Sequence, residues 1–598
     1  MAEITPMMKQ YLEIKEQNKD SILFFRLGDF YEMFNEDAQL ASRELDLTLT
    51  TRDRGKAAED QTPMCGIPYH SSDAYIARLI AKGYKVAICE QTEDPALAKG
   101  LVKRDIIRVI TPGTVIDSAC LDDRRGNFLC GIFLDGQNAG AAFCDMTTGH
   151  THVTAFSGDD RAEHLYNELS RFSPAEAVLS AGAYDNGELV EYLRDKLSCA
   201  VERGENRFEL KACEKAIRAQ FGEERFASLP RNNPAAALAL GALLSYLHET
   251  QKTDLSYIKD LEYYEQGRFM ELDLSARRNL ELTETIRAKE KRGSLLWVLD
   301  KTKTAMGARN LRAWLTRPLR DVAAIERRLG AVEALTKNTV AREELILSLS
   351  GISDMERLIG RIAYGTAGGR DFASLRNSIE RITEVKAQLT AFTTGRLHEL
   401  DNELDTLTDV AQSIRDTLID EPPFSVREGG FIRKGYNAEV DRLHEILSGG
   451  KGLLADIETR EKEKTGIRTL KIGYNKVFGY YIEVSNSFKE QVPETYIRKQ
   501  TLVNGERYIT EELKNLEQEI LTAGDRDKAL EFEIFTALRE SVTAESVRIQ
   551  RAAGLIAELD TLCSLASVAV NNNYCRPSVD DSLSLIHISE PTRLRCIS

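Results

Sequence analysis

The sequence predicts several domains: mixed α/β structure at first, mainly α-helical structure beyond about residue 255, and a small β element inserted between long helices. Three observations lead to this fold class. At 598 residues the chain is too long for one hydrophobic core and suggests roughly four domains. Short apolar runs alternate with helical stretches up to about residue 250, and heptad-like spacing dominates afterwards. Residues 469–488, TLKIGYNKVFGYYIEVSNSF, interrupt that helical pattern with β-branched and aromatic residues.

Residues 1–115 are expected to form a small mixed α/β domain. SILFFRLGDFYEMF (21–34) is typical of a strand and turn, EDAQLASRELD (36–46) of a helix, and YKVAICEQ (84–91) of another strand. TPGT (111–114) is a turn signal near the end of this domain. By itself, a basic cluster before that turn is more typical of a solvated face than of a binding site. The cluster consists of Lys99, Lys103, Arg104 and Arg108.

Residues 116–250 are expected to form a second α/β domain, with strands first and helices after. Two apolar stretches flank the turn-like DGQNAG (135–140), which is typical of a β-hairpin or meander. Asp135 and Asp145 lie on or beside these strands, so a metal-dependent nuclease is one alternative function. It is not favoured, because the sequence places no further acid to complete a metal site and acids at strand ends are usually turn residues.

Beyond about residue 255, apolar spacing predicts long helices, as in LDLSARRNLELTETI (272–286) and SLRNSIERITEVKAQLTAF (374–392). On either side of the β element, charge-laced periodicity predicts antiparallel coiled-coil arms. We therefore expect a helical stalk that ends in a small sheet. The expected divisions are a core and lever domain, a sheet-bearing domain and a pair of return helices, over residues 251–425, 426–530 and 531–582.

Composition limits the functions open to the chain. A hydrophobic content of 42% with 29% charged residues describes a folded globular protein. The longest apolar run, AAALALGALL from Ala235, is too short to span a membrane, and the charged N-terminus favours the cytoplasm. Ten cysteines without a C-x-x-C pair favour reduced thiols over a zinc site or a disulfide framework. The net charge of -15 confines nucleic-acid contacts to local basic patches.

Residues 26–34, RLGDFYEMF, place the acids Asp29 and Glu32 among three aromatic residues and a methionine. A buried strand readily carries Phe30, but a carboxylate set between aromatic side chains needs a partner or a solvent-facing role. Two interpretations follow. Either Phe30 belongs to the core and Glu32 is a surface acid, or both residues face a ligand. An isolated F-x-E motif favours the first interpretation.

Together with other motifs, this stretch resembles the MutS family of DNA mismatch-recognition proteins, from about residue 5 to about residue 582. The matching pieces keep the order and spacing of bacterial members: RLGDFYEMF, PMCGIPYHS, VAICEQTEDP, DIIRVITPGT, GSLLWVLDKTKTAMGARNLRAWLTRPL, GYNKVFGYYIEV and ERYITEELK. The resemblance implies a mismatch-binding domain, an RNase H-like connector, a helical core with levers, and a clamp at 426–530. It implies binding of mispaired or unpaired bases in duplex DNA.

In this family the F-x-E element enters the DNA minor groove, and here it maps to Phe30 and Glu32. An aromatic wedge must unstack a base step, which costs about a few kcal/mol and costs least where pairing is already defective. Glu32 would accept a hydrogen bond from the displaced base or share a proton with it, while its charge opposes binding to ordinary duplex. The resemblance adds Met64 and Tyr69 as groove-lining residues.

The resemblance also implies contacts to the DNA backbone. In the first domain these fall to Arg52 or Arg54 in TTRDRG, to Arg104 and to Arg108, because the planar guanidinium can donate two bonds to phosphate. Such contacts give affinity without sequence information and make binding salt-dependent. For any single clamp residue, the sequence does not distinguish a solvated surface charge from a contact to phosphate. The clamp candidates are Lys476, Arg498, Lys499, Asn504 and Arg507.

Full-length family members carry an ATPase domain that binds ATP and Mg. Here the Gly-Lys pairs at 55–56 and 450–451 are not followed by a hydroxyl residue that could ligate magnesium. We therefore expect no nucleotide cofactor, no metal and no catalytic residue in this chain. The resemblance stops near Ser582. The remainder, LSLIHISEPTRLRCIS (583–598), is expected to be a non-native tail, with a genuine short tail as the rival interpretation.

For the full-length family, the resemblance implies a homodimer that recruits the repair protein MutL and the sliding clamp. Its ligand is double-stranded DNA with mispairs or small loops, and it contacts no membrane. It implies a bacterial cytoplasmic location in association with the nucleoid. One further alternative is a MutS paralogue that acts on DNA junctions, for which loss of the F-x-E element would be the discriminating feature. Phe30 and Glu32 are present.

Overall fold

The computed structural model describes residues 5–52, 61–93, 100–117, 121–253, 255–265, 267, 269–423, 425–475 and 479–580. Arg54, Lys99, Lys476 and the expected tail at 583–598 lie outside the described residues. The chain forms two compact units. The first consists of Met1–Gly365, Ser378–Leu407 and Glu545–Ser598, and the second of Thr366–Asn377 and Thr408–Ala544.

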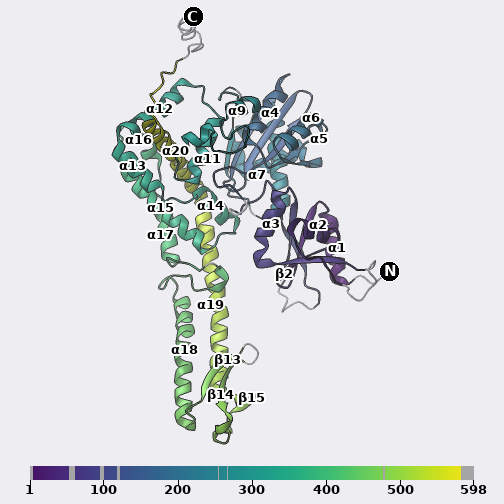
Figure 1. Ribbon diagram of the computed structural model, residues 1–598, viewed down its shortest axis with the longest axis vertical. Helices are drawn as coiled ribbons and strands as arrows, with labels where there is room; N and C mark the ends of the chain where they lie inside the picture. Colours follow the sequence, from purple (N-terminus) through teal and green to yellow (C-terminus); the bar gives the residue numbers. More distant parts are fainter. Residues whose placement is uncertain are drawn as a thin grey trace, which may run out of the picture. The chain divides into compact units, whose positions relative to one another are not determined.

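A six-stranded sheet in the order β3-β4-β2-β1-β5-β6 organises the N-terminal domain. Its strands are β1 (Ser21–Leu27), β2 (Phe30–Phe34), β3 (Thr50–Thr51), β4 (Pro63–Pro68), β5 (Lys85–Gln91) and β6 (Arg104–Ile110). β1 and β5 are parallel, and the other neighbours pair antiparallel. Figure 1 shows this domain in purple. The helices around it are α1 (Pro6–Gln17), α2 (Asn35–Leu45) and α3 (Ser72–Ala81), with a 3-10 turn, η2, at Tyr69–Ser71.

A second six-stranded sheet, in the order β11-β10-β7-β8-β9-β12, follows in the first unit. β7, β8 and β9 form an antiparallel meander, which confirms the meander predicted around residues 135–140. The strands are β7 (Phe128–Leu134), β8 (Asn138–Asp145), β9 (His150–Ser157), β10 (Glu176–Leu179), β11 (Ala200–Arg203) and β12 (Asp260–Tyr263). The helical elements of this domain are α4 (Arg161–Phe172), α5 (Ala181–Tyr184), α6 (Gly187–Glu191), η4 (Tyr192–Lys196), η5 (Glu205–Phe208), α7 (Leu210–Ala227) and α8 (Ala235–Gln251).

The apolar helix α8 packs directly on this sheet. A Cβ added to Gly131 of β7 would lie 2.3 Å from the carbonyl oxygen of Ala239, and one added to Gly140 of β8 would lie 2.1 Å from that of Ala235. Only glycine allows a helix backbone to approach two strands this closely. The run AAALALGALL is therefore a core helix, buried over almost its whole length.

Helices complete the first unit around α20 (Ser546–Asn571), whose apolar surface packs against α10, α11, α12, α13, α14 and α16. α20 is long and apolar enough to cross a membrane, but 67% of its most apolar window is buried in the fold, as in a core helix of a globular protein. α15 (Gly369–Leu389) contributes residues to both units. The other helices are α9 (Leu274–Asn279), α10 (Leu295–Leu299), α11 (Ala305–Thr316), α12 (Val322–Lys337), α13 (Thr339–Leu349), α14 (Met355–Tyr364) and α16 (Gly395–Glu403).

A buried carboxylate joins α20 to the start of α11. Asp560, which is 1% exposed, accepts hydrogen bonds from the backbone N–H of Lys303 at 3.0 Å and of Thr304 at 2.7 Å. The Thr304 hydroxyl also donates to Asp560 at 2.7 Å and in turn accepts from the N–H of Gly307 at 2.9 Å. These bonds satisfy donors that would otherwise remain unpaired at the helix N-terminus.

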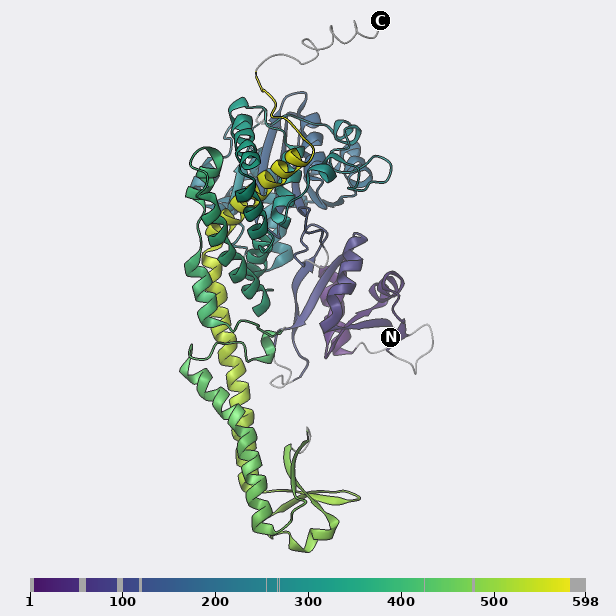
Figure 2. The ribbon, with the colours of Figure 1, turned by 60° about the vertical axis from the view of Figure 1, so that its left-hand side comes forward.

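The second unit consists mainly of two long helices that carry a four-stranded sheet, in the order β13-β14-β16-β15 (Figure 2). The helices, α18 (Ala438–Thr465) and α19 (Glu511–Ala544), pack on each other. α18 begins at the capping side chain of Asn437 and ends at Gly466, whose φ is 71°. The predicted helical stalk ending in a small sheet is confirmed. The remaining elements are α17 (Thr408–Thr417), η6 (Val426–Glu428), β13 (Lys471–Asn475), β14 (Gly479–Ser485), η7 (Asn486–Gln491), β15 (Ile497–Thr501) and β16 (Gly505–Ile509).

Candidate nucleic-acid interface

Phe30 lies at the start of β2, directly after the tight turn of the β1–β2 hairpin. The pairing of Leu27 with Phe30 leaves a two-residue loop that begins with Gly28, whose φ of 57° glycine adopts without steric cost. The apolar cluster beneath α1 includes Phe25 and Phe34 but does not include Phe30. Phe30 is 47% exposed. The interpretation of Phe30 as a core residue is therefore wrong, because the cover that α1 gives to this face does not extend to the hairpin.

Alternation along β2 places Phe30 and Glu32 on one face of the sheet. Tyr31 and Met33 are buried in the cluster that packs under α2 and α3 on the other face. The hydroxyl of Tyr31 donates to the Glu90 carboxylate, which fixes the strand from that buried side. The hairpin thus has one anchored face and one face that carries an exposed aromatic ring beside a carboxylate.

Glu32 is half-buried opposite Gly66 of β4. A Cβ at Gly66 would lie 3.5 Å from the Glu32 side chain, so the glycine leaves the space above the carboxylate open. Burial raises the pKa of Glu32, and the nearby charge of Arg52 opposes that rise. A carboxyl group with a raised pKa shares a proton with a neighbouring acceptor more readily than an ordinary glutamate does.

Arg52 and Met64 flank the same face. The exposed guanidinium of Arg52 lies 5.9 Å from the ring centre of Phe34, and its Nη1 is 3.8 Å from the sulfur of Met7. Met64 is the cross-strand partner of Phe34 and packs partly against the cluster beneath α1. The structure therefore brings Phe30, Glu32, Met64 and Arg52 together along one face.

Tyr69 lies at the same end of the sheet but packs toward the opposite face. Its backbone N–H donates to the carbonyl of Asp29 at 3.0 Å, which ties it to the hairpin. The Arg26 guanidinium lies 3.4 Å from the centre of the Tyr69 ring, and the ring packs partly against the cluster that contains Tyr31. Tyr69 therefore supports the hairpin from the face of the sheet opposite Phe30 and Glu32.

Arg104 is 8% exposed and its guanidinium is held by protein acceptors. Nε donates to the carbonyl of Arg26 at 2.8 Å, and Nη1 donates to Gln10 Oε1 at 3.1 Å and to the carbonyl of Val102 at 3.0 Å. Burial lowers the pKa of Arg104. This geometry departs from the expected phosphate contact, because the polar atoms that would bind phosphate already hold α1 and β1.

Arg108 also departs from the expected phosphate contact. Its Nη2 donates to the carbonyl of Thr114 at 3.1 Å, and its guanidinium lies 4.9 Å from the ring centre of Tyr364 in α14. β6, which carries Arg108, is the edge strand farthest in sheet order from the β3 and β4 edge. Arg108 therefore joins the N-terminal domain to the helices of the first unit.

In the second unit, β15 is an edge strand that presents cations to solvent. Arg498 and Lys499 are both exposed, and the register of β15 against β16 shifts between Arg498 and Gln500, so that Lys499 lies in a bulge. Arg498 Nη1 lies 3.3 Å from Glu506 Oε1. Lys499 has no ion-pair partner among the described residues. Asn504 is exposed in the turn from β15 to β16.

Arg507 and Glu506 of β16 are held within the sheet. Arg507 Nε donates to Glu483 Oε2 at 3.2 Å, Nη1 donates to Gln500 Oε1 at 2.9 Å, and the guanidinium lies 4.1 Å from the Tyr481 ring centre. Hydrogen bonds from Lys489 and Tyr508 lower the pKa of Glu506 to about 2. Of the clamp candidates, Lys499, Arg498 and Asn504 are therefore the groups most available to a phosphate.

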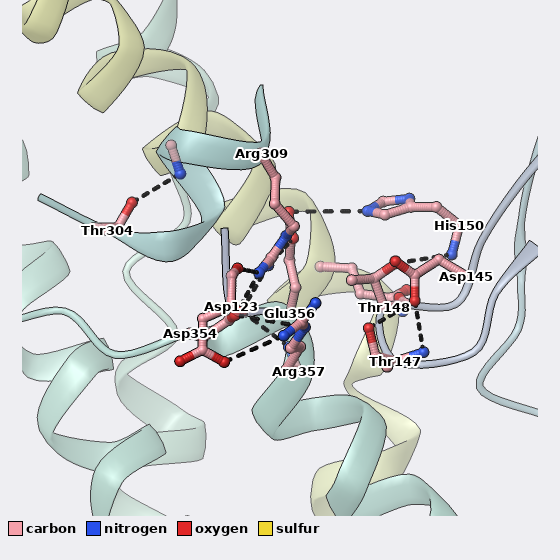
Figure 3. A network of polar contacts seen from close by, with 12 residues as sticks. Asp123, Asp145, Thr147, Thr148, His150, Thr304, Arg309, Asp354, Glu356 and Arg357 are labelled. Carbon is pink, nitrogen blue, oxygen red and sulfur yellow. Dashed lines mark hydrogen bonds and ion pairs between the residues drawn. The ribbon is translucent and has the colours of Figure 1, made fainter. Parts of the chain in front are cut away.

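A partly buried polar network between the second sheet and the core helices was missed by the sequence reasoning (Figure 3). Arg309 of α11 donates two bonds to Asp354, at 2.6 and 2.8 Å, and one to Glu356 Oε2 at 2.6 Å. His150 of β9 lies between Asp260, at 2.7 Å, and Glu356, at 3.9 Å. No local motif could reveal it, because its members come from four separate segments.

Burial and charge act in opposite directions in this network. Burial alone would raise the pKa of Glu356, but the charges of Arg309 and His150 hold it at about 2. Burial alone would lower the pKa of His150, but its hydrogen bond to Asp260 and the nearby carboxylate of Glu356 raise it to about 10. The network therefore consists of ionised groups that compensate one another.

Asp135 and Asp145 do not form a metal site. They lie at opposite ends of β8, on the order of 20 Å apart along the strand. Asp135 accepts from the backbone N–H of Gln137 and Asn138 in the turn, and Asp145 accepts from Asn127 and Thr147. The nuclease alternative is wrong for this pair of residues, because each carboxylate is a turn acceptor at its own strand end.

Comparisons with known proteins cover most of the chain. The family models for MutS domain I, MutS domain II and MutS domain III match residues 5–119, 127–259 and 275–566. The chain is 48% identical over 585 residues to the DNA mismatch repair protein MutS of Acetivibrio thermocellus, covering 97% of this chain and 66% of that protein. It is 46% identical to the DNA mismatch repair protein MutS of Alkaliphilus oremlandii, covering 97% of this chain and 66% of that protein. It is also 46% identical to the DNA mismatch repair protein MutS of Ruminiclostridium cellulolyticum, covering 99% of this chain and 68% of that protein. The chain thus spans about two thirds of the length of these relatives.

Proposed function

The chain belongs to the MutS family, and on that basis we propose that it recognises and binds mispaired or unpaired bases in duplex DNA. The observation that carries the proposal is the exposed Phe30 ring beside Glu32 at the anchored end of the N-terminal sheet. An aromatic side chain at a rigid protein edge suits insertion between base steps, which partly unstacks them and kinks the duplex.

The local geometry supports separate roles for the two residues. Phe30 can enter a groove without unfolding the hairpin, because Tyr31 and Tyr69 anchor the opposite face of the hairpin to the rest of the domain. Glu32, whose pKa burial raises, can hydrogen-bond to a displaced base or share a proton with it. As an anion it opposes phosphate-lined duplex, so binding is favoured where the base step is already weak.

Phosphate contacts in this proposal come from exposed cations and one exposed amide side chain. Arg52 serves the face that carries Phe30, and Arg498, Lys499 and Asn504 serve the clamp sheet. Arg104, Arg108 and Arg507 are assigned to holding the fold, because their side chains are buried or half-buried and their guanidinium groups already have protein partners. Arg498 also contacts Glu506, but its side chain is exposed. Backbone contacts of this kind position the protein on DNA and carry no sequence information.

The remaining parts of the proposal concern the whole protein. Full-length members would hydrolyse ATP with Mg, form a homodimer, and recruit MutL and the sliding clamp in the bacterial cytoplasm, while this chain binds DNA without catalysing a reaction. The RNase H-like assignment of the connector is supported by an antiparallel meander extended by the parallel strands β10 and β11. A junction-specific paralogue is the less favoured alternative, because Phe30 and Glu32 are both present.

We expect Phe30→Ala to remove mismatch discrimination. The variant loses the stacking of one aromatic ring, about 1–3 kcal/mol, while phosphate contacts remain. The ratio of affinities for a G·T duplex and its matched control should fall by about tenfold or more, toward one. Fluorescence anisotropy at low salt measures both affinities in one buffer.

Two further variants make this result specific. Ile107→Ala removes another exposed apolar side chain of the same domain, 45% exposed on β6, and should leave the ratio unchanged. Glu32→Ala should weaken mispair binding less than Phe30→Ala and strengthen binding to matched duplex, because a negative charge is lost. If Phe30→Ala keeps the parent ratio, the wedge assignment fails.

We expect the double variant Arg498→Ala, Lys499→Ala to weaken binding to mismatched and matched duplex by similar factors. Removing two phosphate contacts should also make the slope of log K against log salt shallower by up to about 2. Titrations at several salt concentrations measure this slope. Lys464→Ala, which removes an exposed lysine from α18, serves as the control. A loss confined to the mispaired duplex would refute the assignment.

A further inference from the structure

Three potential metal ligands meet where the two long helices of the second unit pack together. His444 lies on α18, and Asp527 and Glu531 lie one turn apart on α19. His444 Nε2 is 3.3 Å from Asp527 Oδ2 and 3.3 Å from Glu531 Oε1. The three ligand atoms lie within 4.8 Å of one another. The i, i+4 spacing on α19 directs both carboxylates to the same side of the helix.

These distances fit a common cation. Zinc binds imidazole nitrogen and carboxylate oxygen at about 2.0–2.2 Å in a tetrahedral arrangement, which separates neighbouring ligand atoms by about 3.3–3.6 Å. Both separations from His444 fall in that range, and the separation between the two carboxylates is within 4.8 Å. The side chains therefore need only small adjustments to hold an ion between them.

The carboxylates are buried and incompletely compensated. Asp527 is 4% exposed and Glu531 is fully buried, and the Oδ1 atom of Asp527 has no hydrogen-bond partner among the described residues. Burial raises the pKa of Asp527 and of Glu531. Buried carboxylates are normally paired or bound to a metal, so the free oxygen of Asp527 is an observation that the protein side chains alone leave unexplained.

A backbone loop orients Glu531 toward His444. The N–H groups of Gly430 and Phe431 donate to Glu531 Oε2, at 2.6 and 3.4 Å, and that of Ile432 donates to Oε1 at 3.3 Å. Gly429 has a φ of 72°, and a Cβ there would lie 3.4 Å from Glu531 Oε2. Outer hydrogen bonds of this kind fix the orientation of a ligating carboxylate.

We propose that His444, Asp527 and Glu531 bind one divalent transition-metal ion of the zinc type, which cross-links α18 to α19. Imidazole as a ligand favours zinc and its neighbours over magnesium and calcium, which prefer all-oxygen sites. His444, about one third exposed, gives the ion a path from solvent. The site departs from the sequence expectation of no metal, and it is independent of the proposed DNA-binding role.

The competing arrangement is a protonated His444 that compensates the carboxylates without any ion. Among the described residues, the charged groups that face the site are Lys528 on α19, beside Asp527, and the three ligands themselves. A cationic imidazole and a bound metal cannot coexist on Nε2, because both require its lone pair. Metal binding therefore distinguishes the two arrangements directly.

The test uses the full chain in a Cys575→Ser background, because Cys575 is the exposed cysteine of the described residues. Zn²⁺ is added to metal-free protein, and affinity and stoichiometry are measured by competition with a chromophoric chelator. The triple variant His444→Ala, Asp527→Asn, Cys575→Ser measures any zinc bound elsewhere on the chain. We expect the Cys575→Ser protein to bind one ion per chain more than this triple variant does. Co²⁺ in the same site should show the absorption of a low-coordinate nitrogen and oxygen site, and Mg²⁺ should not displace it.

His444→Ala and Asp527→Asn should each weaken Zn²⁺ binding by at least about tenfold. Zn²⁺ should raise the thermal midpoint of the parent and leave that of His444→Ala unchanged. His398→Ala, which removes a histidine that contacts only Asn402 by hydrogen bond among the described residues, is the matched control and should bind as the parent does. Absence of saturable binding at micromolar Zn²⁺, or unchanged affinity in His444→Ala, would overturn the proposal.

Discussion

Asp560→Ala is expected to destabilise the first unit by about 3–5 kcal/mol, because two buried donors and one partly buried donor lose their acceptor at once. The bonds from the Thr304 N–H and hydroxyl to Asp560 are buried, and the bond from the Lys303 N–H is partly buried. Urea unfolding followed by circular dichroism measures the loss. Asp560→Asn keeps one acceptor oxygen and should cost less than Asp560→Ala.

Two glycines provide a matched comparison for this contact. Gly307→Ala would place a Cβ 2.3 Å from Asp560 Oδ2, so we expect it to displace the carboxylate and destabilise α11. Gly554→Ala, on the same helix as Asp560, meets open space and should be neutral or stabilising by up to about 1 kcal/mol. A loss below about 1 kcal/mol in Asp560→Ala would contradict the role assigned to this carboxylate.

Arg309→Met should cost about 3–5 kcal/mol, because it leaves the buried carboxylate of Glu356 and the half-buried carboxylate of Asp354 without their main partner. Arg124→Ala removes an exposed partner of Asp300 and is the control, with an expected change of about 1 kcal/mol or less. Both values come from urea unfolding at neutral pH. Equal losses in the two variants would contradict a special role for Arg309.

The pH dependence of the free energy of unfolding tests the same network independently. The pKa of Glu356 is depressed, so its contribution is present above an unfolded value near about 4.3 and is lost as pH falls toward about 2. The pKa of His150 is raised, so its contribution is complete below about 6.5 and is lost as pH rises toward about 10. Arg309→Met should flatten the acid side of the profile, because the main cause of the Glu356 depression is removed.

Local pattern predicted elements whose cause is local. The strand and turn within residues 21–34, the meander around residues 135–140 and the helical arms beside 469–488 follow from turn residues, alternation and heptad spacing. The two-residue length of the turn at Gly28 was not predicted. The strands β15 and β16 carry IRKQT and GERYI, whose charges hide the alternation, so they were expected only as part of a small sheet.

Long-range partners decided the roles that the sequence could not predict. Arg104 is buried by Gln10 and Arg26, which lie 94 and 78 residues earlier, so its basic character suggested a surface site that the fold does not provide. Asp560 meets Thr304 across 256 residues. For the cluster at His444, the D-x-x-x-E spacing of Asp527 and Glu531 was a readable signal, but only helix packing brings the histidine to it.

The short hairpin that presents Phe30 has a kinetic consequence. Its backbone is closed by the sheet pairing of Leu27 and Phe30, so only the ring torsions remain to be ordered when DNA is met. Exposed side chains change rotamer in picoseconds to nanoseconds, whereas a hairpin takes about 1–10 μs to form. In the proposed function, a protein moving along a duplex would therefore sample each base step without waiting for a loop to fold, and the deformability of the DNA would set the pace of the search.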